Sequence, residues 1–188
     1  KNKSKYLYFK AETHYSVQEF VAALPLYKNA LEYFVKNPAE LDIKKKSIDG
    51  IFSCIEFSKL NKNDELKELE YAYQKHIELW PKSKKSKQIF PKLFSLYLAK
   101  NDLTKTQNTL DRFIASFKKS KKKQMELFTI QLDQIIKLKD SNLLADKINL
   151  LNTGYLKFDN EMVKKTEKIL ATMLFNEYQA LNSKGESK

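Results

Sequence analysis

The stretch "HIELWPKS", residues His76–Ser83, has the pattern of a helix that ends at a proline. The stretch "FIASFKKS", residues Phe113–Ser120, repeats this pattern 37 residues later without the proline. In a helical repeat the packing positions persist while the residues that end each helix vary. The recurrence therefore predicts an array of similar helical units rather than a fold with a single unrepeated core.

The pattern occurs four times, in "YKNALEYF", "YQKHIELW", "LDRFIASF" and "LNTGYLKF". Each segment places large apolar residues at positions i, i+4 and i+7, which is one face of an α-helix over two turns. The segment ends are separated by 46, 37 and 41 residues. The positions predicted to form a continuous apolar seam are Tyr27, Leu31, Phe34, Tyr73, Ile77, Trp80, Leu110, Ile114, Phe117, Leu151, Tyr155 and Phe158.

A second marker predicts where helices begin. Asp64, Asp102 and Asp140 are each 38 residues apart, and each follows an apolar residue by four positions. Aspartate accepts hydrogen bonds from the free amides of a helix start, so these residues are predicted N-caps. In the first unit Ser16 and Glu19 have the spacing of a capping box.

These markers, with only 3 Gly and 4 Pro in 188 residues, predict an all-α fold. The expected architecture is a right-handed superhelix of about four antiparallel helix pairs with a C-terminal capping helix. Pro25 should kink the earliest second helix or mark its true start. We expect first helices at 3–15, 43–60, 88–100 and 122–139, and second helices at 19–35, 64–80, 102–117 and 141–157. These helices form four units, at 3–38, 43–81, 88–118 and 122–158, which are followed by a capping helix at 160–181. We expect residues 1–181 to be a single domain and residues 182–188 to be a polar tail.

The segment "FVAALPLYKNALEYFVKNP" resembles the second half of a tetratricopeptide repeat. Ala23, Tyr27, Ala30 and Pro38 stand near the positions where that family has small, aromatic, small and proline residues, although Pro38 lies a few residues late. The resemblance implies a non-catalytic scaffold that binds a protein or peptide on a concave surface lined by first helices.

The later units depart from the family pattern, since Leu69 and His76 replace small residues and Lys118 replaces the proline. The phrase "IELWPKS" followed by a new helix resembles the repeat found in bacterial envelope proteins. That likeness implies an envelope or periplasmic setting. The alternative is a module of a cytoplasmic regulatory or motility complex, and the start without Met leads us to expect a processed or truncated piece.

The residues that usually carry catalysis are not grouped in this sequence. His14 and His76 fall in different units without neighbours at ligand spacing, and the glycines are isolated. Cys54 lies in the apolar run "IFSCIEF" and is predicted to be a buried small hydrophobe. We therefore expect no enzyme activity, no metal and no cofactor.

Aromatic residues at helical spacing are predicted to pack between helices. Two such groups stand out, one in the second unit and one in the third. They are Phe52, Ile55 and Phe57, and Phe90, Phe94 and Tyr97.

Lysine dominates the charge of the chain. The net charge is +12, and Arg112 is the only arginine among 35 basic residues. This bias disfavours nucleic acid as a partner, because proteins that bind nucleic acid use arginine and interleaved aromatic residues.

The lysine clusters follow second helices and precede first helices, so stacked links would form a basic edge. That edge would dock an acidic protein, anionic lipid headgroups without a membrane span, or another polyanion. The alternative is that these lysines only keep the links soluble. The candidate edge comprises Lys44, Lys45, Lys46, Lys82, Lys84, Lys85, Lys87, Lys118, Lys119, Lys121, Lys122 and Lys123.

Overall fold

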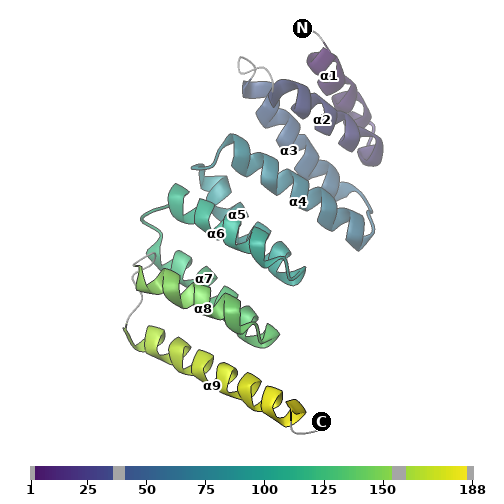
Figure 1. The fold of residues 1–188 in the computed structure, drawn as a ribbon. Helices are drawn as coiled ribbons and strands as arrows, with labels where there is room; N and C mark the ends of the chain where they lie inside the picture. Colours follow the sequence, from purple (N-terminus) through teal and green to yellow (C-terminus); the bar gives the residue numbers. More distant parts are fainter. Residues whose placement is uncertain (1–2, 36–40, 154–159, 186–188) are drawn as a thin grey trace. The chain divides into compact units, whose positions relative to one another are not determined.

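The computed structural model describes residues 3–35, 41–153 and 160–185, and within these ranges it contains nine α-helices and no strand. Consecutive helices pack against one another in sequential pairs, which confirms the all-α class (Figure 1). The helices are α1 (Lys3–Ser16), α2 (Phe20–Val35), α3 (Leu41–Phe57), α4 (Lys62–Leu79), α5 (Lys84–Ala99), α6 (Leu103–Ser116), α7 (Lys121–Leu138), α8 (Ser141–Asn152) and α9 (Asn160–Gly185).

The chain divides into two compact units, Lys1–Leu96 and Tyr97–Lys188. In the first unit α2 packs against both α1 and α3, and α3 packs against α4. In the second unit α7 packs against both α6 and α8, and α8 packs against α9. Each of α2, α3, α7 and α8 is thus packed by both of its neighbours in the chain, as expected for stacked helical hairpins.

The predicted helices are present, but several of their ends differ from the prediction. Helix α8 ends at Asn152 and α3 at Phe57, five and three residues before the predicted ends. Pro25 lies inside α2 and does not mark its start. Helix α5 begins at Lys84, four residues before the predicted boundary. Helix α9 runs to Gly185, so residues 182–185 are helical and not part of a polar tail.

The first unit is built around the aromatic ring of Tyr27. This ring and Leu31 are buried, as the seam pattern predicts, while the side chain of Phe34 lies outside the described part of the chain. A Cβ at position 50 would lie 2.6 Å from Cζ of Tyr27, so Gly50 is what allows α3 to approach the ring. The phenol donates a 2.5 Å hydrogen bond to Oε1 of Glu12 in α1. Tyr27 therefore joins three helices.

The second unit has a core of aliphatic and phenyl side chains. Leu110 and Leu151 of the predicted seam are buried, whereas Ile114 and Phe117 are half-buried, and Tyr155 and Phe158 lie outside the described residues. The buried apolar side chains of α7 and α8 in this unit are Leu127, Phe128, Leu132, Ile135, Leu144 and Ile148.

The predicted helix starts are right for the second unit and wrong for the first. Asp102 and Asp140 are N-caps, and their carboxylates accept from the backbone N–H groups of Lys105 and Leu143 at 3.0 and 2.8 Å. The cap of α4 is Asn61, because its side-chain oxygen accepts from the N–H of Asp64 at 3.0 Å.

The capping box predicted at the start of α2 is also wrong. Ser16 is the last residue of α1, and its hydroxyl donates to the carbonyl of Thr13. The carboxylate of Glu19 instead pairs with Nδ1 of His14 at 2.5 Å.

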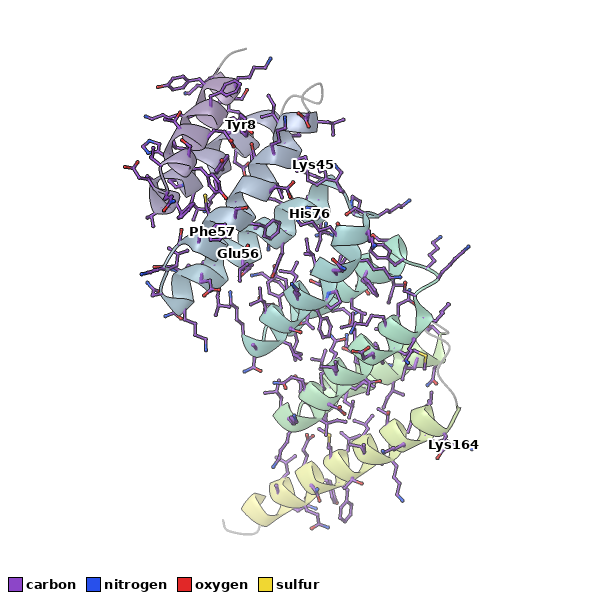
Figure 2. All side chains as sticks on the ribbon, turned by 180° about the vertical axis from the view of Figure 1, so that it is seen from behind. Tyr8, Lys45, Glu56, Phe57, His76 and Lys164 are labelled. Atoms are coloured by element: carbon purple, nitrogen blue, oxygen red, sulfur yellow. The ribbon has the colours of Figure 1, made fainter. Side chains whose placement is uncertain are left out.

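The two aromatic groups predicted to pack have different outcomes. Phe90, Phe94 and Tyr97 are buried as predicted. Phe57, at the end of α3, is 55% exposed and so is not a core residue (Figure 2). Its ring contacts that of Phe20 with the centroids 5.4 Å apart, but Phe57 is the last residue of α3. The other members of this group do pack, since Ile55 is buried and the ring of Phe52 lies 5.8 Å from that of Tyr73.

Candidate binding surfaces

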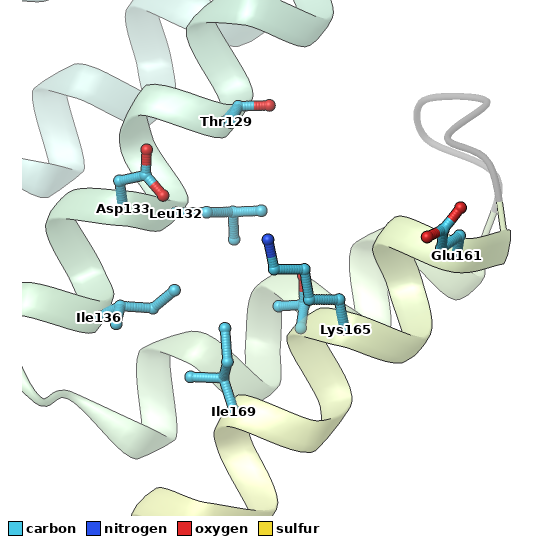
Figure 3. A pocket seen from close by; sticks show the side chains of 8 residues that line it. Thr129, Leu132, Asp133, Ile136, Glu161, Lys165 and Ile169 are labelled. Carbon is cyan, nitrogen blue, oxygen red and sulfur yellow. The ribbon is translucent and has the colours of Figure 1, made fainter.

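A cleft of about 430 Å³ lies between α7 and α9 in the second unit (Figure 3). Its apolar floor is formed by Leu132 and Ile136 from α7 and Ile169 from α9. Asp133 and Lys165 line opposite walls, and the side chain of Lys165 extends across the cleft toward α7. The remaining lining residues are Thr129, Glu161 and Thr166.

This cleft can receive the side chains of an amphipathic peptide. Its volume lies within the range of about 300–1,000 Å³ for ligand sites, and an apolar floor with a few polar groups is their usual lining. One wall carries a carboxylate and the other an ammonium group, so a ligand with both signs of charge would be oriented across it. No sequence motif marks these residues, because the i, i+3, i+4 spacing of Leu132, Asp133 and Ile136 also marks an ordinary packing face.

A more open hollow of about 600 Å³ lies at the turn between α1 and α2 in the first unit. Phe20 and Phe57 form its apolar part, with their ring centroids 5.4 Å apart, and Val21 stands beside them 64% exposed. Glu19 and Lys59 provide charges at its edge. Such an exposed apolar hollow is a feature of protein-binding surfaces, although its few polar groups define no particular ligand.

The candidate lysines lie mainly in the first turns of helices and not in the links. Lys45 and Lys46 belong to α3, and Lys84 begins α5. Lys121 begins α7, whereas Lys82 and its counterparts at 118–119 do lie in links. Lysine at a helix start opposes the helix dipole, which costs typically 0.3–1 kcal/mol per charge. Helix stability therefore does not explain why lysines occupy the first turns of α5 and α7, where no acidic residue is present.

Several of these lysines have partners or are buried. Lys44 is only 5% exposed and so cannot contribute a free ammonium group to a docking edge. Lys85 lies 2.8 Å from Asp49 and 4.5 Å from the centroid of the Phe52 ring, which ties α5 to α3. The exposed members of the candidate edge are Lys45, Lys46, Lys82, Lys84, Lys85, Lys87, Lys118, Lys119, Lys121 and Lys122, and Lys123 is half-exposed.

His76 is a buried structural side chain in the first unit (Figure 2). Its ring packs against Trp80 at 5.2 Å, and its Nε2 lies 3.3 Å from Oγ of Ser83. Burial, followed by the charge of Lys85, lowers the pKa of His76 to about 4. Nδ1 is buried without a hydrogen-bond partner in the described structure, so a proton there would be costly.

Cys54 is fully buried in the core of the first unit, as its apolar surroundings predict. Burial and the nearby Glu12 raise the pKa of its thiol to about 11. The thiolate is the nucleophilic form, so this thiol is poorly suited to react at neutral pH.

Two further features of the described residues bear on other functions. No group of three or more His, Cys, Asp or Glu side chains there could hold a metal ion. None of the helices in those residues has the length and apolar character needed to cross a bilayer.

Comparison with protein-family models, with curated proteins and with solved structures finds no match for this chain. The class that the fold defines is therefore an all-α protein of sequentially paired helices, an arrangement consistent with a helical repeat.

Proposed function

We propose that this chain is a tetratricopeptide-like repeat that acts as a non-catalytic scaffold for a protein or peptide. The observation that supports this most directly is the cleft between α7 and α9. In the predicted register α7 is a first helix and α9 is the capping helix that follows the last pair, and first helices line the binding groove that the resemblance implies. The buried thiol of Cys54 and the buried ring of His76 are consistent with a scaffold and offer no accessible nucleophile or base.

The experiment compares two variants in a pull-down from the native organism. Lys165→Glu reverses a charge inside the cleft, and Lys137→Glu reverses the charge of an exposed lysine in the last turn of α7. We expect a partner that the unaltered chain and Lys137→Glu recover and that Lys165→Glu loses. A set of partners unchanged by Lys165→Glu, and unchanged by Ile136→Asp on the cleft floor, would contradict binding in this cleft.

The setting of the scaffold is proposed from the resemblance alone. A bacterial envelope or periplasmic assembly is favoured, and a cytoplasmic regulatory or motility complex is the alternative. Fractionation of native cells, with the protein followed by antibody, separates the two. A signal found only in the cytoplasmic fraction would favour the alternative.

A second candidate function is binding of a polyanion or an anionic membrane surface. It is favoured by exposed lysines in the first turns of α5 and α7, where they are unfavourable to the helices themselves. We expect the triple reversal Lys84→Glu, Lys121→Glu, Lys122→Glu to weaken binding to heparin and to vesicles containing phosphatidylserine. Binding should also fall steeply with salt.

The same reversal should not harm folding. Glutamate in a first turn is favoured by the helix dipole, so the variant should be at least as stable as the parent chain. Unchanged affinity for both probes would rule out this second function.

A further inference from the structure

The second half of α9 differs in composition from the rest of the chain. Charged residues make up 31% of the protein, yet Glu177 is the only one between Ile169 and Ser183. The carboxylate of Glu177 accepts a 3.0 Å hydrogen bond from the hydroxyl of Ser141, so this charge is engaged with α8. A segment so depleted of charge is unusual for an exposed helix and typical of the centre of a protein interface.

The same segment carries four large apolar side chains on its surface, which we call the α9 stripe. Leu174, Phe175, Tyr178 and Leu181 are 48, 59, 61 and 70% exposed. Aromatic side chains offer about 150–250 Å² each, so the two rings alone present roughly 200–300 Å² to water. With the two leucines, the stripe approaches the largest apolar patches of ordinary monomers, which are often functional.

The stripe is separate from the cleft described above. With about 3.6 residues per turn, Leu174, Tyr178 and Leu181 fall on one side of α9. Lys165 and Ile169, which line the cleft, fall on the opposite side by the same count. One ligand can therefore occupy the cleft while another covers the stripe.

The repeat itself indicates the shape of the group that covers the stripe. In the second unit α7 is packed by helices on two sides, α6 and α8, and α8 is packed by α7 and α9. Among the described residues the backbone of α9 packs closely only on α8, and its side that faces α7 lines the cleft. A helix laid along the stripe would give α9 the second neighbour that α7 and α8 already have.

Electrostatics selects among the sources of that helix. The chain carries a net charge of +12, so a second copy would be repelled, whereas an acidic partner would be attracted. Lys164, which is labelled in Figure 2, and Lys168 are exposed in the first half of α9, before the stripe begins, and Glu167 lies between them in the sequence. A membrane surface is disfavoured because helices that lie on membranes carry lysines on their polar face, and residues 169–183 contain none.

We propose that the α9 stripe binds an amphipathic helix of a different protein, with apolar residues facing the stripe and acidic residues along its flanks. This site goes beyond the proposed peptide cleft and rests on the proposed function only in taking the chain as a protein-binding scaffold. Because the two sites use different residues, either can fail without the other.

The test uses two synthetic helical peptides of about 15–20 residues, long enough to cover the stripe. They share one leucine face, and their flanking positions are all glutamate in one and all lysine in the other. Fluorescence anisotropy with the full chain should show binding of the glutamate peptide that weakens with salt, and at least tenfold weaker binding of the lysine peptide. Equal binding of the two peptides would overturn the proposal.

Variants locate the binding. Phe175→Ser with Tyr178→Ser should weaken the glutamate peptide by about thirtyfold, since central aromatic residues carry much of the affinity of such contacts. The matched control, Tyr6→Ser with Phe9→Ser, removes two aromatic side chains of the first unit that are 63 and 61% exposed, and it should bind normally.

Three further results would overturn the proposal. The first is unchanged binding in the Phe175→Ser, Tyr178→Ser variant, with circular dichroism showing it folded. The second is a dimer of the unaltered chain in light scattering that this variant abolishes, because the occupant would then be a second copy. The third is adsorption to vesicles of phosphatidylserine and phosphatidylcholine that the variant abolishes, because the occupant would then be a membrane.

Discussion

The two compact units contain similar helical hairpins but are held together differently. In the first unit polar groups tie the helices to one another around aromatic rings. Tyr71 of α4 donates to Oε1 of Glu32 in α2 at 2.8 Å, and Lys28 of α2 lies 2.8 Å from Glu68 and 4.6 Å from the centroid of the Tyr71 ring. These contacts link α2 to α4, which are the second helices of two successive pairs.

The second unit relies on apolar packing and helix caps. Two of its helices begin at aspartate N-caps, and its fully buried large side chains are Phe113, Phe128, Leu110 and Ile135. A few polar bonds also cross between helices, such as that from Gln134 to Asn101 at 2.7 Å. Both units bury large apolar side chains, and the first adds polar contacts that link α2 to α4, so the two units should respond differently to substitution.

The largest expected effect is in the apolar core of the second unit. Phe113→Ala removes a fully buried ring, and truncations of this kind cost about 3–5 kcal/mol because a cavity is left behind. Urea unfolding followed by far-ultraviolet circular dichroism measures the loss. The control Phe175→Ala removes a ring that is 59% exposed and should change stability by less than about 0.5 kcal/mol. A loss below about 1 kcal/mol for Phe113→Ala would show that this core is loosely packed.

The next effect is a pH dependence that belongs to the first unit. The pKa of His76 is about 4 in the folded chain, against 6.5 as its ordinary value. Between these pH values the unfolded chain binds more protons, so the free energy of unfolding falls as the pH drops from 6.5 to 4. The loss approaches about 3 kcal/mol and is absent above pH 6.5.

Urea titrations at pH 7, 5.5 and 4.5, read by the fluorescence of Trp80, follow this loss in the first unit, because Trp80 is the only tryptophan. His76→Gln cannot titrate and should flatten the pH dependence above pH 5. The control His14→Gln should leave it in place. Equal slopes for His76→Gln and the unaltered chain would contradict the assignment.

The third effect tests the close approach of α3 to Tyr27. Gly50→Ala puts a methyl group where it would meet the ring at 2.6 Å, and overpacking of this kind costs about 1–3 kcal/mol. Alanine is the better helix former by about 1 kcal/mol, which offsets part of the cost. We expect a net loss of stability in urea unfolding read by Trp80. In the background of Tyr27→Leu, which removes the ring, Gly50→Ala should instead be neutral or stabilising.

The apolar periodicity of the sequence was enough to predict the all-α class and most helix positions. Tyr27, Ile77 and Leu110 are buried where the i, i+4, i+7 pattern places them, because that spacing reports which face of a helix meets its neighbours. The pattern failed at Phe57, the last residue of α3, whose ring contacts that of Phe20 and yet stays 55% exposed.

The candidate sites were harder to predict, because they depend on which helices become neighbours. The cleft joins Asp133 of α7 to Lys165 of α9, 32 positions apart in the sequence, and no local pattern connects them. The run of lysines in the sequence groups Lys44 with Lys45 and Lys46, which are exposed, but the side chain of Lys44 is buried. The α9 stripe has a signal in the sequence, the absence of charge between Ile169 and Glu177, although its exposure required the structure.

The smallest expected effects concern the helix starts, where the sequence markers held in one unit and not in the other. Asp102→Ala and Asp140→Ala each remove a side-chain cap in the second unit and should cost about 1 kcal/mol. In the first unit Asn61→Ala should cost as much, because Asn61 holds the capping bond of α4.

Asp64→Ala provides the contrast, because Asp64 lies inside the first turn of α4 and does not hold the capping bond. Its carboxylate interacts with the helix dipole, accepts from Nδ2 of Asn61 at 2.6 Å and lies 3.7 Å from Nζ of Lys67, and all three groups are exposed. Asp64→Ala should lower the free energy of unfolding by a few tenths of a kcal/mol, and this loss should shrink at high salt, unlike the loss caused by Asn61→Ala. Thermal unfolding of the four variants in low and high salt measures both quantities. A larger loss for Asp64→Ala than for Asn61→Ala would restore the evenly spaced aspartates as equivalent caps and remove this difference between the units.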